Sequence, residues 1–370
     1  MRATRAIIHI DRFCENVKRI REKIGRAPLI CVPVKADAYG HGAVPVARAA
    51  IDAGARYLAV ATVDEGVDLR AAGIRAPILV LSLPLPEELA DAARLRLSLL
   101  LGDEDMVKEA ARAAEQIGEK LAVHLKIDTG MGRVGCRPEA ASALAVHIAS
   151  FRSLVYAGTA THLSVADSRM PEDSDYTKKQ VRIFTQSIES IRARGVDPGI
   201  VHAANSGAIL LHEDAYFDMV RPGILLYGYS PVEHPSITVN PVMELVTRIV
   251  LIKTVRRGEA LSYGRTWIAS EDTRIATIPV GYGDGLPRGL SGNFSVYIRR
   301  CLYPLAGRIC MDQCMIDLGN DTDIRRWDEV TIFGGNAQSA ADIAVKLGTI
   351  PYEITCNINK RVPRVYTSLF

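Results

Sequence analysis

Hydrophobic residues in the first two thirds of the chain form short continuous runs instead of alternating with polar ones. Between these runs the spacing is helical, as in Phe13, Val17 and Ile20. Continuous apolar runs are typical of parallel strands buried on both faces. Eight of them within about 230 residues favour a closed (β/α)8 TIM-type barrel over an open doubly wound sheet. The predicted strands are Leu29–Val34, Tyr57–Ala61, Pro77–Ser82, Leu97–Leu101, Leu121–Ile127, Val155–Thr161, Ile200–Ala204 and Met219–Tyr227.

The pattern changes around residues 230–241, a stretch that contains three prolines. Downstream, shorter runs separated by turns predict a second, mostly β domain. Its predicted strands are Glu244–Val255, Thr273–Val280, Phe294–Ile298, Met315–Leu318 and Glu329–Phe333. We therefore expect an α/β protein in which a barrel over residues 11–232 precedes a β-rich domain over residues 233–370. Residues 1–10 are expected to add a strand to the C-terminal domain.

Composition and charge narrow the function. Of the 370 residues, 48% are apolar and 24% charged, which excludes a disordered chain. The net charge is only +3 and no basic run occurs, so neither nucleic acid nor an anionic membrane is an expected partner. No apolar stretch approaches the roughly twenty residues of a membrane span, and the start of the chain lacks the apolar core of a signal peptide. An odd number of cysteines, seven, predicts reduced thiols in the cytoplasm, and no residue spacing predicts a metal site.

One glycine motif points toward a nucleotide. The stretch from Gly130 to Gly135 matches G-x-G-x-x-G and follows a predicted strand. However, it follows the fifth strand and not the first, and no acidic residue ends the next strand to bind a ribose. A nicotinamide dehydrogenase has no other support in the sequence.

A lysine stands where barrel enzymes carry their chemistry. Lys35 lies at the C-terminal end of the first predicted strand, in the string VPVKADAYGHG. Desolvation there would lower the pKa of its amine and make it a nucleophile able to form a Schiff base.

Nine ordered strings distributed over nearly the whole chain resemble the alanine racemases, barrel-type enzymes that use pyridoxal 5′-phosphate (PLP). Two departures are minor: Pro33 lies inside the first strand, and Gly283 stands where the family often has alanine. The strings are VKADAYGHG, HLKIDTGMGRVG, THLSVAD, HAANS, MVRPGILLYG, LSYGRTW, PVGYGDG, GRICMDQ and PYEITCNI.

The resemblance implies a PLP site in the barrel and two catalytic bases. Lys35 would carry the cofactor as a Schiff base, and Arg221 would face its pyridine nitrogen. Because arginine stays protonated, that nitrogen would remain an acceptor, which suppresses a long-lived carbanion and its side reactions. The phosphate and the rest of the cofactor would be held by Tyr39, Asn205, Ser206, Gly223, Ile224 and Tyr352.

Racemisation removes a proton from one face of the α-carbon and delivers one to the other, so it needs two bases. The resemblance supplies Lys35 and Tyr263, with His162 beside the tyrosine and linked to Arg221. Arg133 would donate to the Tyr263 phenolate and to the substrate carboxylate. Lys126 corresponds to a lysine that carries a carbamate in some members, and the sequence leaves open whether it does so here.

The remaining implied residues concern the substrate. Met311 and Asp312 match a segment that binds the substrate carboxylate through a backbone N–H. A narrow access corridor that favours small amino acids would be formed by Tyr282, Tyr352, Asp167, Arg288, Arg308 and Ile350. A homodimer that shares its sites between subunits is also implied, as is the supply of D-alanine for bacterial peptidoglycan.

Three other functions can be compared with the residues of this sequence. A broader small amino acid racemase acting on serine stays open, because an apolar pocket rejects one added hydroxyl only weakly. A barrel-type PLP amino acid decarboxylase should place an acidic residue at the ring nitrogen, where this chain has Arg221. A non-catalytic PLP carrier would lack the second domain with Tyr263.

Overall fold

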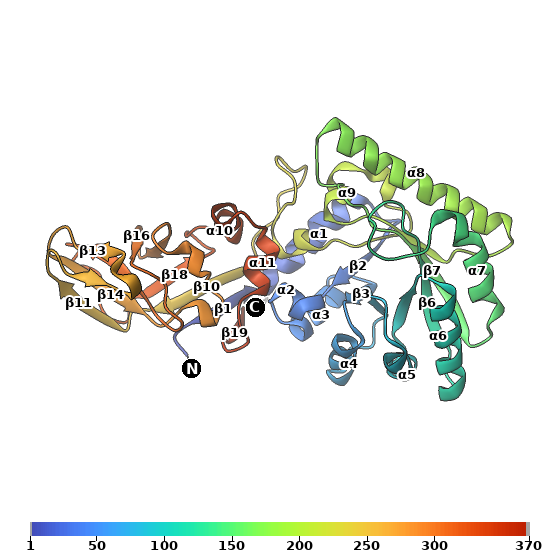
Figure 1. The fold of residues 1–370 in the computed structure, drawn as a ribbon, viewed down its shortest axis with the longest axis horizontal. Helices are drawn as coiled ribbons and strands as arrows, with labels where there is room; N and C mark the ends of the chain where they lie inside the picture. Colours follow the sequence, from blue (N-terminus) through green and yellow to red (C-terminus); the bar gives the residue numbers. More distant parts are fainter. Residues whose placement is uncertain (1, 368–370) are drawn as a thin grey trace. The chain divides into compact units, whose positions relative to one another are not determined.

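The computed structural model describes residues 2–367 and divides into two compact units (Figure 1). The barrel unit comprises residues 13–38 and 43–240. Among the described residues, the sheet unit comprises 2–12, 39–42 and 241–367. The short segment 39–42, directly after the Lys35 turn, therefore groups with the C-terminal part of the chain.

Eight parallel strands close the barrel unit, which confirms the predicted fold class. Closure is made by the first and last strands, where Leu29 and Ile30 pair with Met219 and Val220. In order around the barrel the strands are β2 (Leu29–Pro33), β3 (Tyr57–Val60), β4 (Ile78–Val80), β5 (Ser98–Leu101), β6 (Leu121–Lys126), β7 (Leu154–Ala160), β8 (Ile200–His202) and β9 (Met219–Val220).

The predicted strand Met219–Tyr227 is wrong beyond Val220. Pro222 has no N–H to donate to a neighbouring strand, and the N–H of Gly223 donates instead to Ser206 Oγ at 2.8 Å. The chain then forms a short 3₁₀ helix over Ile224–Tyr227. This early end of β9 places Arg221 and Gly223 in a loop directly after the barrel strand.

Helices surround the strands, and local sequence signals explain their ends. In α6 (Glu104–Ile117) the Asp103 side chain caps the first turn, and Gly118 ends the helix with a φ of +74°. The other helices are α1 (Ile10–Ile24), α3 (Ala43–Asp52), α4 (Val63–Ala71), α5 (Leu89–Arg94), α7 (Ala141–Ser150), α8 (Pro171–Ala193) and α9 (Ser206–Leu211).

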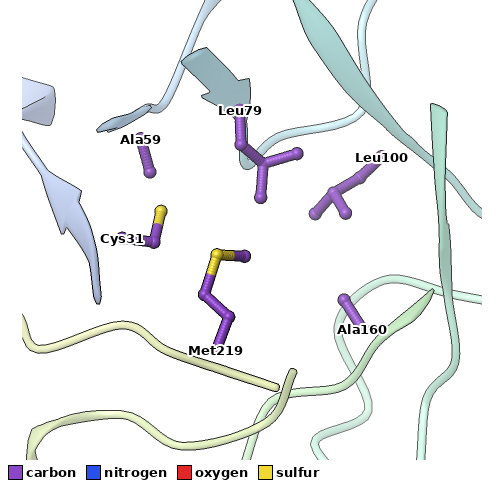
Figure 2. Close-up of a cluster of buried hydrophobic side chains, with 6 residues drawn as sticks. All are labelled: Cys31, Ala59, Leu79, Leu100, Ala160 and Met219. Atoms are coloured by element: carbon purple, nitrogen blue, oxygen red, sulfur yellow. The ribbon is translucent and has the colours of Figure 1, made fainter. Parts of the chain in front are cut away.

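Side chains from strands around the barrel wall fill its interior, as Figure 2 shows. Leu79 and Met219 are completely buried, and Leu100 is nearly so. They pack with the small side chains of Cys31, Ala59 and Ala160. Because these residues come from six different strands, the barrel has a packed core and not a pore.

A nine-stranded sheet dominates the sheet unit, in the order β11-β14-β17-β16-β15-β18-β10-β1-β19. The N-terminal strand β1 (Arg5–His9) pairs antiparallel with β10 and parallel with β19. The other strands are β10 (Met243–Arg248), β11 (Leu251–Val255), β14 (Thr273–Ile278), β15 (Ser295–Ile298), β16 (Cys301–Ala306), β17 (Cys314–Gly319), β18 (Glu329–Phe333) and β19 (Arg364–Thr367), with a separate hairpin of β12 (Ala260–Leu261) and β13 (Trp267–Ile268).

The sheet unit differs from the sequence prediction in three ways. Four of its strands were not predicted: β12, β13, β16 and β19. The predicted strand Glu244–Val255 is two strands, because Ile249 donates to Asp328 and Val250 donates to Thr277, so that β10 and β11 join different neighbours. Two helices were also missed, α10 (Ala340–Leu347) and α11 (Pro351–Cys356).

The glycine motif at residues 130–135 does not open a helix. The Asp128 carboxylate accepts hydrogen bonds from the N–H groups of Gly130 and Gly132, which turns the motif into a loop. Gly135 is required there, since a Cβ would lie 2.9 Å from the Lys126 carbonyl oxygen. Between residues 2 and 367 there is neither a helix long and apolar enough to cross a membrane nor a cluster of metal-binding side chains.

Candidate active site

Lys35 begins a turn of left-handed backbone two residues after β2 ends. Ala36, Asp37 and Ala38 have φ values of 51–53°, and Tyr39 continues at 55°. This conformation costs about 1–2 kcal/mol for each residue that is not glycine. It directs the chain sharply away from the barrel strand immediately after the lysine.

Two carboxylates hold this turn. Glu65 Oε1 accepts from the Ala36 N–H at 2.6 Å, and its other oxygen accepts from the Ala61 N–H at the start of α4. Asp37 Oδ1 accepts from the Ala43 N–H at 2.7 Å. Glu65 thus caps a helix and fixes the residue next to Lys35, a role that the sequence analysis missed.

Arg221 is a buried cation that follows β9, with 7% of its surface exposed. Its Nη1 lies 2.6 Å from His202 Nδ1, and its Nη2 donates to the carbonyls of Thr161 and Ala203. Burial lowers the pKa of Arg221 to about 10, so the side chain is still charged at neutral pH. Among the described residues no carboxylate pairs with it, and Nε donates no hydrogen bond.

The Arg221 contacts determine the protonation of two buried histidines. A guanidinium can only donate, so His202 Nδ1 accepts and its proton resides on Nε2. His202 Nε2 lies 2.9 Å from His124 Nδ1 and donates to it, which places the His124 proton on Nε2. That nitrogen is buried without a partner within residues 2–367. Burial, assisted by the Arg221 charge, lowers the pKa of His124 to about 3, and that of His202 also falls well below its usual value.

His162 and Lys126 adjoin this group. His162 Nδ1 lies 3.4 Å from Arg221 Nη2, and burial followed by the Arg221 charge lowers the pKa of His162 to about 3. Lys126 ends β6, is 4% exposed and donates to the Ile127 carbonyl at 3.0 Å. Burial lowers the pKa of Lys126 to about 8, with a smaller contribution from Arg221. The exposed Arg133 contributes to lowering both pKa values.

A cup of polar groups lies between the start of α9 and the loop after β9. Asn205 caps α9 through Oδ1, and Ser206 Oγ accepts from the N–H groups of Gly223 and Leu225 at 2.8 and 3.4 Å. Gly207 lets this helix approach Asp167, whose backbone nitrogen would lie 2.7 Å from a Cβ at that position. The predicted residues Asn205, Ser206, Gly223 and Ile224 are therefore brought together. A hydroxyl beside backbone N–H groups at this end of a barrel suits a phosphate.

Tyr39 and Tyr352 meet in the sheet unit. Their ring centroids are 5.7 Å apart at an interplanar angle of 43°, and burial raises the pKa of Tyr39. Tyr352 belongs to α11, which approaches closely because Gly40 has no side chain: a Cβ there would lie 2.1 Å from the Thr355 carbonyl oxygen.

Tyr263 also belongs to the sheet unit, and it is 70% exposed. It begins a short 3₁₀ turn and borders an open pocket of about 620 Å³. Ser262, Cys310 and Met315 line the same pocket. An exposed phenol beside an open pocket is suited to contact a group outside its own sheet.

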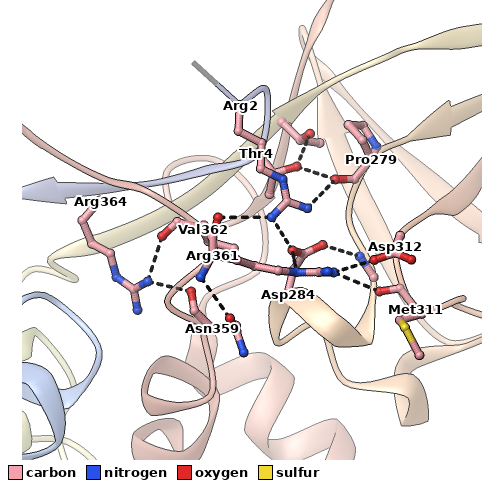
Figure 3. Close-up of polar contacts among 12 residues, drawn as sticks. Arg2, Thr4, Pro279, Asp284, Met311, Asp312, Asn359, Arg361, Val362 and Arg364 are labelled. Carbon is pink, nitrogen blue, oxygen red and sulfur yellow. Dashed lines mark hydrogen bonds and ion pairs between the residues drawn. The ribbon is translucent and has the colours of Figure 1, made fainter.

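The segment with Met311 and Asp312 is anchored by a buried carboxylate, as Figure 3 shows. Asp284 is fully buried and receives Arg361 at 2.7 Å and Arg2 at 2.6 Å. Arg361 reaches on to Asp312 at 2.8 Å and to the Met311 carbonyl at 3.4 Å. No hydrogen bond among the described residues uses the N–H of Met311 or of Asp312. The loop therefore presents amide donors that a carboxylate ligand could accept.

Comparison with known proteins accounts for both units. The model for the alanine racemase N-terminal domain matches residues 8–231, and that for the alanine racemase C-terminal domain matches residues 242–366. The chain belongs to the alanine racemase family. It is 50% identical over 374 residues to the alanine racemase of Treponema denticola, covering 99% of this chain and 98% of that one.

Solved structures of the family have the same fold. The alanine racemase of Clostridium difficile 630 superimposes with a TM-score of 0.95 at 36% identity, covering 99% of this chain and 96% of that one. The Bacillus anthracis enzyme with bound L-Ala-P gives a TM-score of 0.93 at 35% identity, covering 100% and 96%.

Within this family framework, the predicted residues fall into two groups. In the barrel unit, Lys126, His162 and Arg221 lie together, and so do the polar groups around Ser206 (Asn205, Ser206, Gly223 and Ile224). The same unit also contains Lys35, Arg133 and Asp167. The sheet unit holds the pair Tyr39–Tyr352 and the pair Met311–Asp312, together with Tyr263, Tyr282, Arg288, Arg308 and Ile350.

Besides Glu65, four supporting residues were not predicted from the sequence: His124, His202, Asp284 and Arg361. His124, His202 and Asp284 lie in strings that carry the alanine racemase resemblance, HLKIDTG, HAANS and PVGYGDG. A polar residue inside an otherwise apolar strand was the available signal for the two histidines, because such a group needs a partner when buried.

Proposed function

We propose that this chain racemises alanine with PLP bound at the mouth of its barrel, and that the D-alanine it forms supplies bacterial peptidoglycan. The observation that carries this proposal is Arg221, a buried cation held by a neutral histidine and by carbonyl groups. A decarboxylase of the same fold would need an acidic group at the ring nitrogen. The unused Nε–H of Arg221 fits a neutral pyridine nitrogen that accepts a hydrogen bond.

The residues present fit the cofactor. Lys35 would bind it covalently, Arg221 would face the ring, and the phosphate would be bound by the hydroxyls of Tyr39, Tyr352 and Ser206 with backbone N–H groups at Gly223 and Ile224. Asn205 supports this cup by capping α9. When bound, PLP withdraws electrons from the substrate and so makes its α-proton acidic.

Lys35 and Tyr263 are the proposed bases, one for each face of the α-carbon. A free phenol has a pKa near 10, so Tyr263 needs stabilisation of its anion. His162 accepts from Arg221 through Nδ1 and therefore carries its proton on Nε2, where it is a donor. We propose that His162 and Arg133 donate to the Tyr263 oxygen, and that Arg133 also binds the substrate carboxylate.

We propose that residues of the sheet unit, together with Asp167, select the substrate by its carboxylate and its size. The free amides of Met311 and Asp312 would bind the carboxylate. Tyr282, Tyr352, Asp167, Arg288, Arg308 and Ile350 would narrow the access corridor to small amino acids. Serine would be a weak second substrate, because one added hydroxyl is rejected by only about a hundredfold.

Lys126 is proposed to carry a carbamate. With a pKa of about 8, an appreciable fraction of this amine is neutral near pH 7 and can react with carbon dioxide. The product is an anion, which would orient Arg133, whereas an ammonium group would repel it.

The proposal predicts a yellow protein that forms D-alanine from L-alanine. Borohydride should attach the cofactor irreversibly to Lys35, and a label on another lysine would refute the assignment. Tyr263→Phe should keep the colour and lose racemisation by about 10²–10⁴-fold. In heavy water, single-turnover exchange of the α-proton should be lost for L-alanine and retained for D-alanine. Equal loss for both enantiomers would contradict the division of faces.

We further propose a cytoplasmic homodimer in which each site takes Tyr263 from the partner. Support comes from the exposed Tyr263 and from other exposed side chains of the sheet unit such as Met311 and Ile268, each more than half exposed. None of the seven cysteines forms a disulfide within the described residues.

Mixing two inactive variants tests the assembly. If Lys35→Ala and Tyr263→Phe chains are refolded together, about half of the dimers are mixed and each contains one intact site. About a quarter of all sites should therefore regain activity. A confirmed mixed dimer without activity would show that both residues of one chain serve the same site.

A further inference from the structure

The residue before Tyr263 has a backbone conformation that is almost confined to glycine. Ser262 has φ 62° and ψ −179°. A side chain in this region collides with its own backbone, and such residues persist only where the surroundings enforce them. Two further residues after the tyrosine also have positive φ, Gly264 at 72° and Arg265 at 48°. Tyr263 is thus held in a tight turn, with the strained residue Ser262 directly before it and positive-φ residues after it.

Residues 307–310 enforce the conformation of Ser262. The Ser262 hydroxyl donates to the Arg308 carbonyl at 2.7 Å, and Cys310 Sγ lies 3.5 Å from the same hydroxyl oxygen. Gly307 makes room for this contact, since a Cβ there would lie 2.8 Å from Ser262 Cβ. The hydroxyl therefore ties the strained residue to a neighbouring loop.

A second contact from the same loop supports the other side of the tyrosine. A Cβ at Gly264 would lie 2.9 Å from Arg308 Nη1, so the Arg308 guanidinium lies directly against that glycine. Arg308 thus contacts the turn twice, through its carbonyl before Tyr263 and through its side chain after it. Such a clamp fixes the direction of a side chain that is itself 70% exposed and has little packing of its own.

We infer that Ser262 is a positioning residue for Tyr263: its hydroxyl holds the strained backbone that aims the phenol. The inference rests on the proposed function, because it requires Tyr263 to be a base. Glycine would adopt the same φ without strain, but it would also allow many others and would lack the hydroxyl. Retaining serine at a position that favours glycine is expected where orientation matters more than local stability.

Two substitutions separate strain from anchoring. Ser262→Ala keeps the strain and loses the hydrogen bond, so its melting temperature should fall below that of the wild type. Ser262→Gly also loses the bond but relieves the strain, so it should melt above Ser262→Ala. Ser270→Gly is the matched control at an exposed serine of the same unit with ordinary φ, and it should bring neither a gain in stability nor a change in kcat.

The kinetic test uses the full-length enzyme loaded with PLP. Displacing a catalytic group by about 1 Å costs up to about 100-fold, so Ser262→Gly should lower kcat by about 10- to 100-fold while KM changes by less than about threefold. Exchange of the α-proton should decline for L-alanine far more than for D-alanine. Hydrogen–deuterium exchange of residues 262–266 should be faster in Ser262→Gly than in the wild type, a readout that is independent of turnover.

The results for Ser262→Gly and Tyr263→Phe distinguish a wrong role for Ser262 from a wrong role for Tyr263. If Ser262→Gly has wild-type kcat while Tyr263→Phe is inactive, Ser262 does not position the tyrosine and the inference is overturned. Equal loss of exchange for both enantiomers in Ser262→Gly would also overturn it, because the damage would not be specific to Tyr263. If Tyr263→Phe retains full activity, the proposed function of Tyr263 fails instead.

Discussion

Removal of one buried histidine should change how stability depends on pH. His124 is fully buried, and the hydrogen bond from His202 occupies its Nδ1. Its pKa falls to about 3 because burial, and then the Arg221 charge, disfavour the protonated form. In the unfolded chain the same side chain titrates near pH 6.5. Between these values the unfolded state binds a proton that the folded state excludes, so stability decreases as the pH falls.

The size of this effect follows from the two pKa values. Folding stability changes by about 1.4 kcal/mol per pH unit for each proton bound only by the unfolded state. Between pH 7 and pH 5 the unfolded histidine goes from mostly neutral to almost fully protonated, while folded His124 stays neutral. His124 therefore removes about 2 kcal/mol of stability over this interval. His162, with its pKa also near 3, acts in the same direction.

The substitution to make is His124→Asn, because Asn Oδ1 can accept from His202 in place of Nδ1. Urea unfolding, followed by circular dichroism with saturating PLP, gives the stability of variant and wild type at pH 7 and pH 5. The variant should lose about 2 kcal/mol less than the wild type between these pH values. A packing defect in the variant lowers its stability equally at both pH values. Cofactor binding affects variant and wild type equally at each pH. Both effects therefore cancel when the pH-dependent loss of the variant is subtracted from that of the wild type.

The exposed His234 provides the control, since His234→Asn should reproduce the wild-type pH dependence. If His124→Asn lost as much stability as the wild type, His124 would already be charged in the folded protein. The hydrogen-bond directions derived from Arg221 would then be incorrect.

Two other predictions concern the core and the substrate loop. Leu79→Ala truncates a fully buried side chain in the barrel and should cost about 2–5 kcal/mol in urea unfolding, whereas Leu85→Ala at an exposed site should cost less than about 0.5 kcal/mol. Asp284→Asn removes the charge that pairs with Arg2 and Arg361, which should lower the free energy of unfolding by about 3 kcal/mol. It should also raise the KM for alanine, because Arg361 holds the loop that contains Met311. An unchanged KM in steady-state assays would show that Asp284 does not position that loop for substrate binding.

Much of the barrel could be predicted from local pattern alone. Strands buried on both faces need continuous apolar runs, and all eight runs begin within a few residues of an observed strand. Lys35 could be placed because a residue that follows a barrel strand is at the strand's C-terminal end in any closed arrangement. The short motifs carried the family resemblance, and through it most of the proposed site.

Contacts between distant strands were decided only by the tertiary structure. His124 and His202 are 78 residues apart, and their partnership depends on how strands β6, β8 and β9 close into a barrel. The end of β9 after Val220 depends on Ser206, whose hydroxyl takes the N–H of Gly223. A local pattern reports which residues are buried, but not which of the buried polar groups meet.

The backbone around the two proposed bases was equally beyond the sequence. Nothing in the residue types of Ala36 or Ser262 indicates a positive φ, because both prefer ordinary conformations. The Lys35 turn is left-handed because the Glu65 carboxylate accepts from the Ala36 N–H and the Asp37 carboxylate accepts from the Ala43 N–H. Ser262 is strained because a loop some 46 residues further along the chain accepts its hydroxyl. The sequence determined which residues stand beside the bases, and long-range hydrogen bonds determined how their backbone is bent.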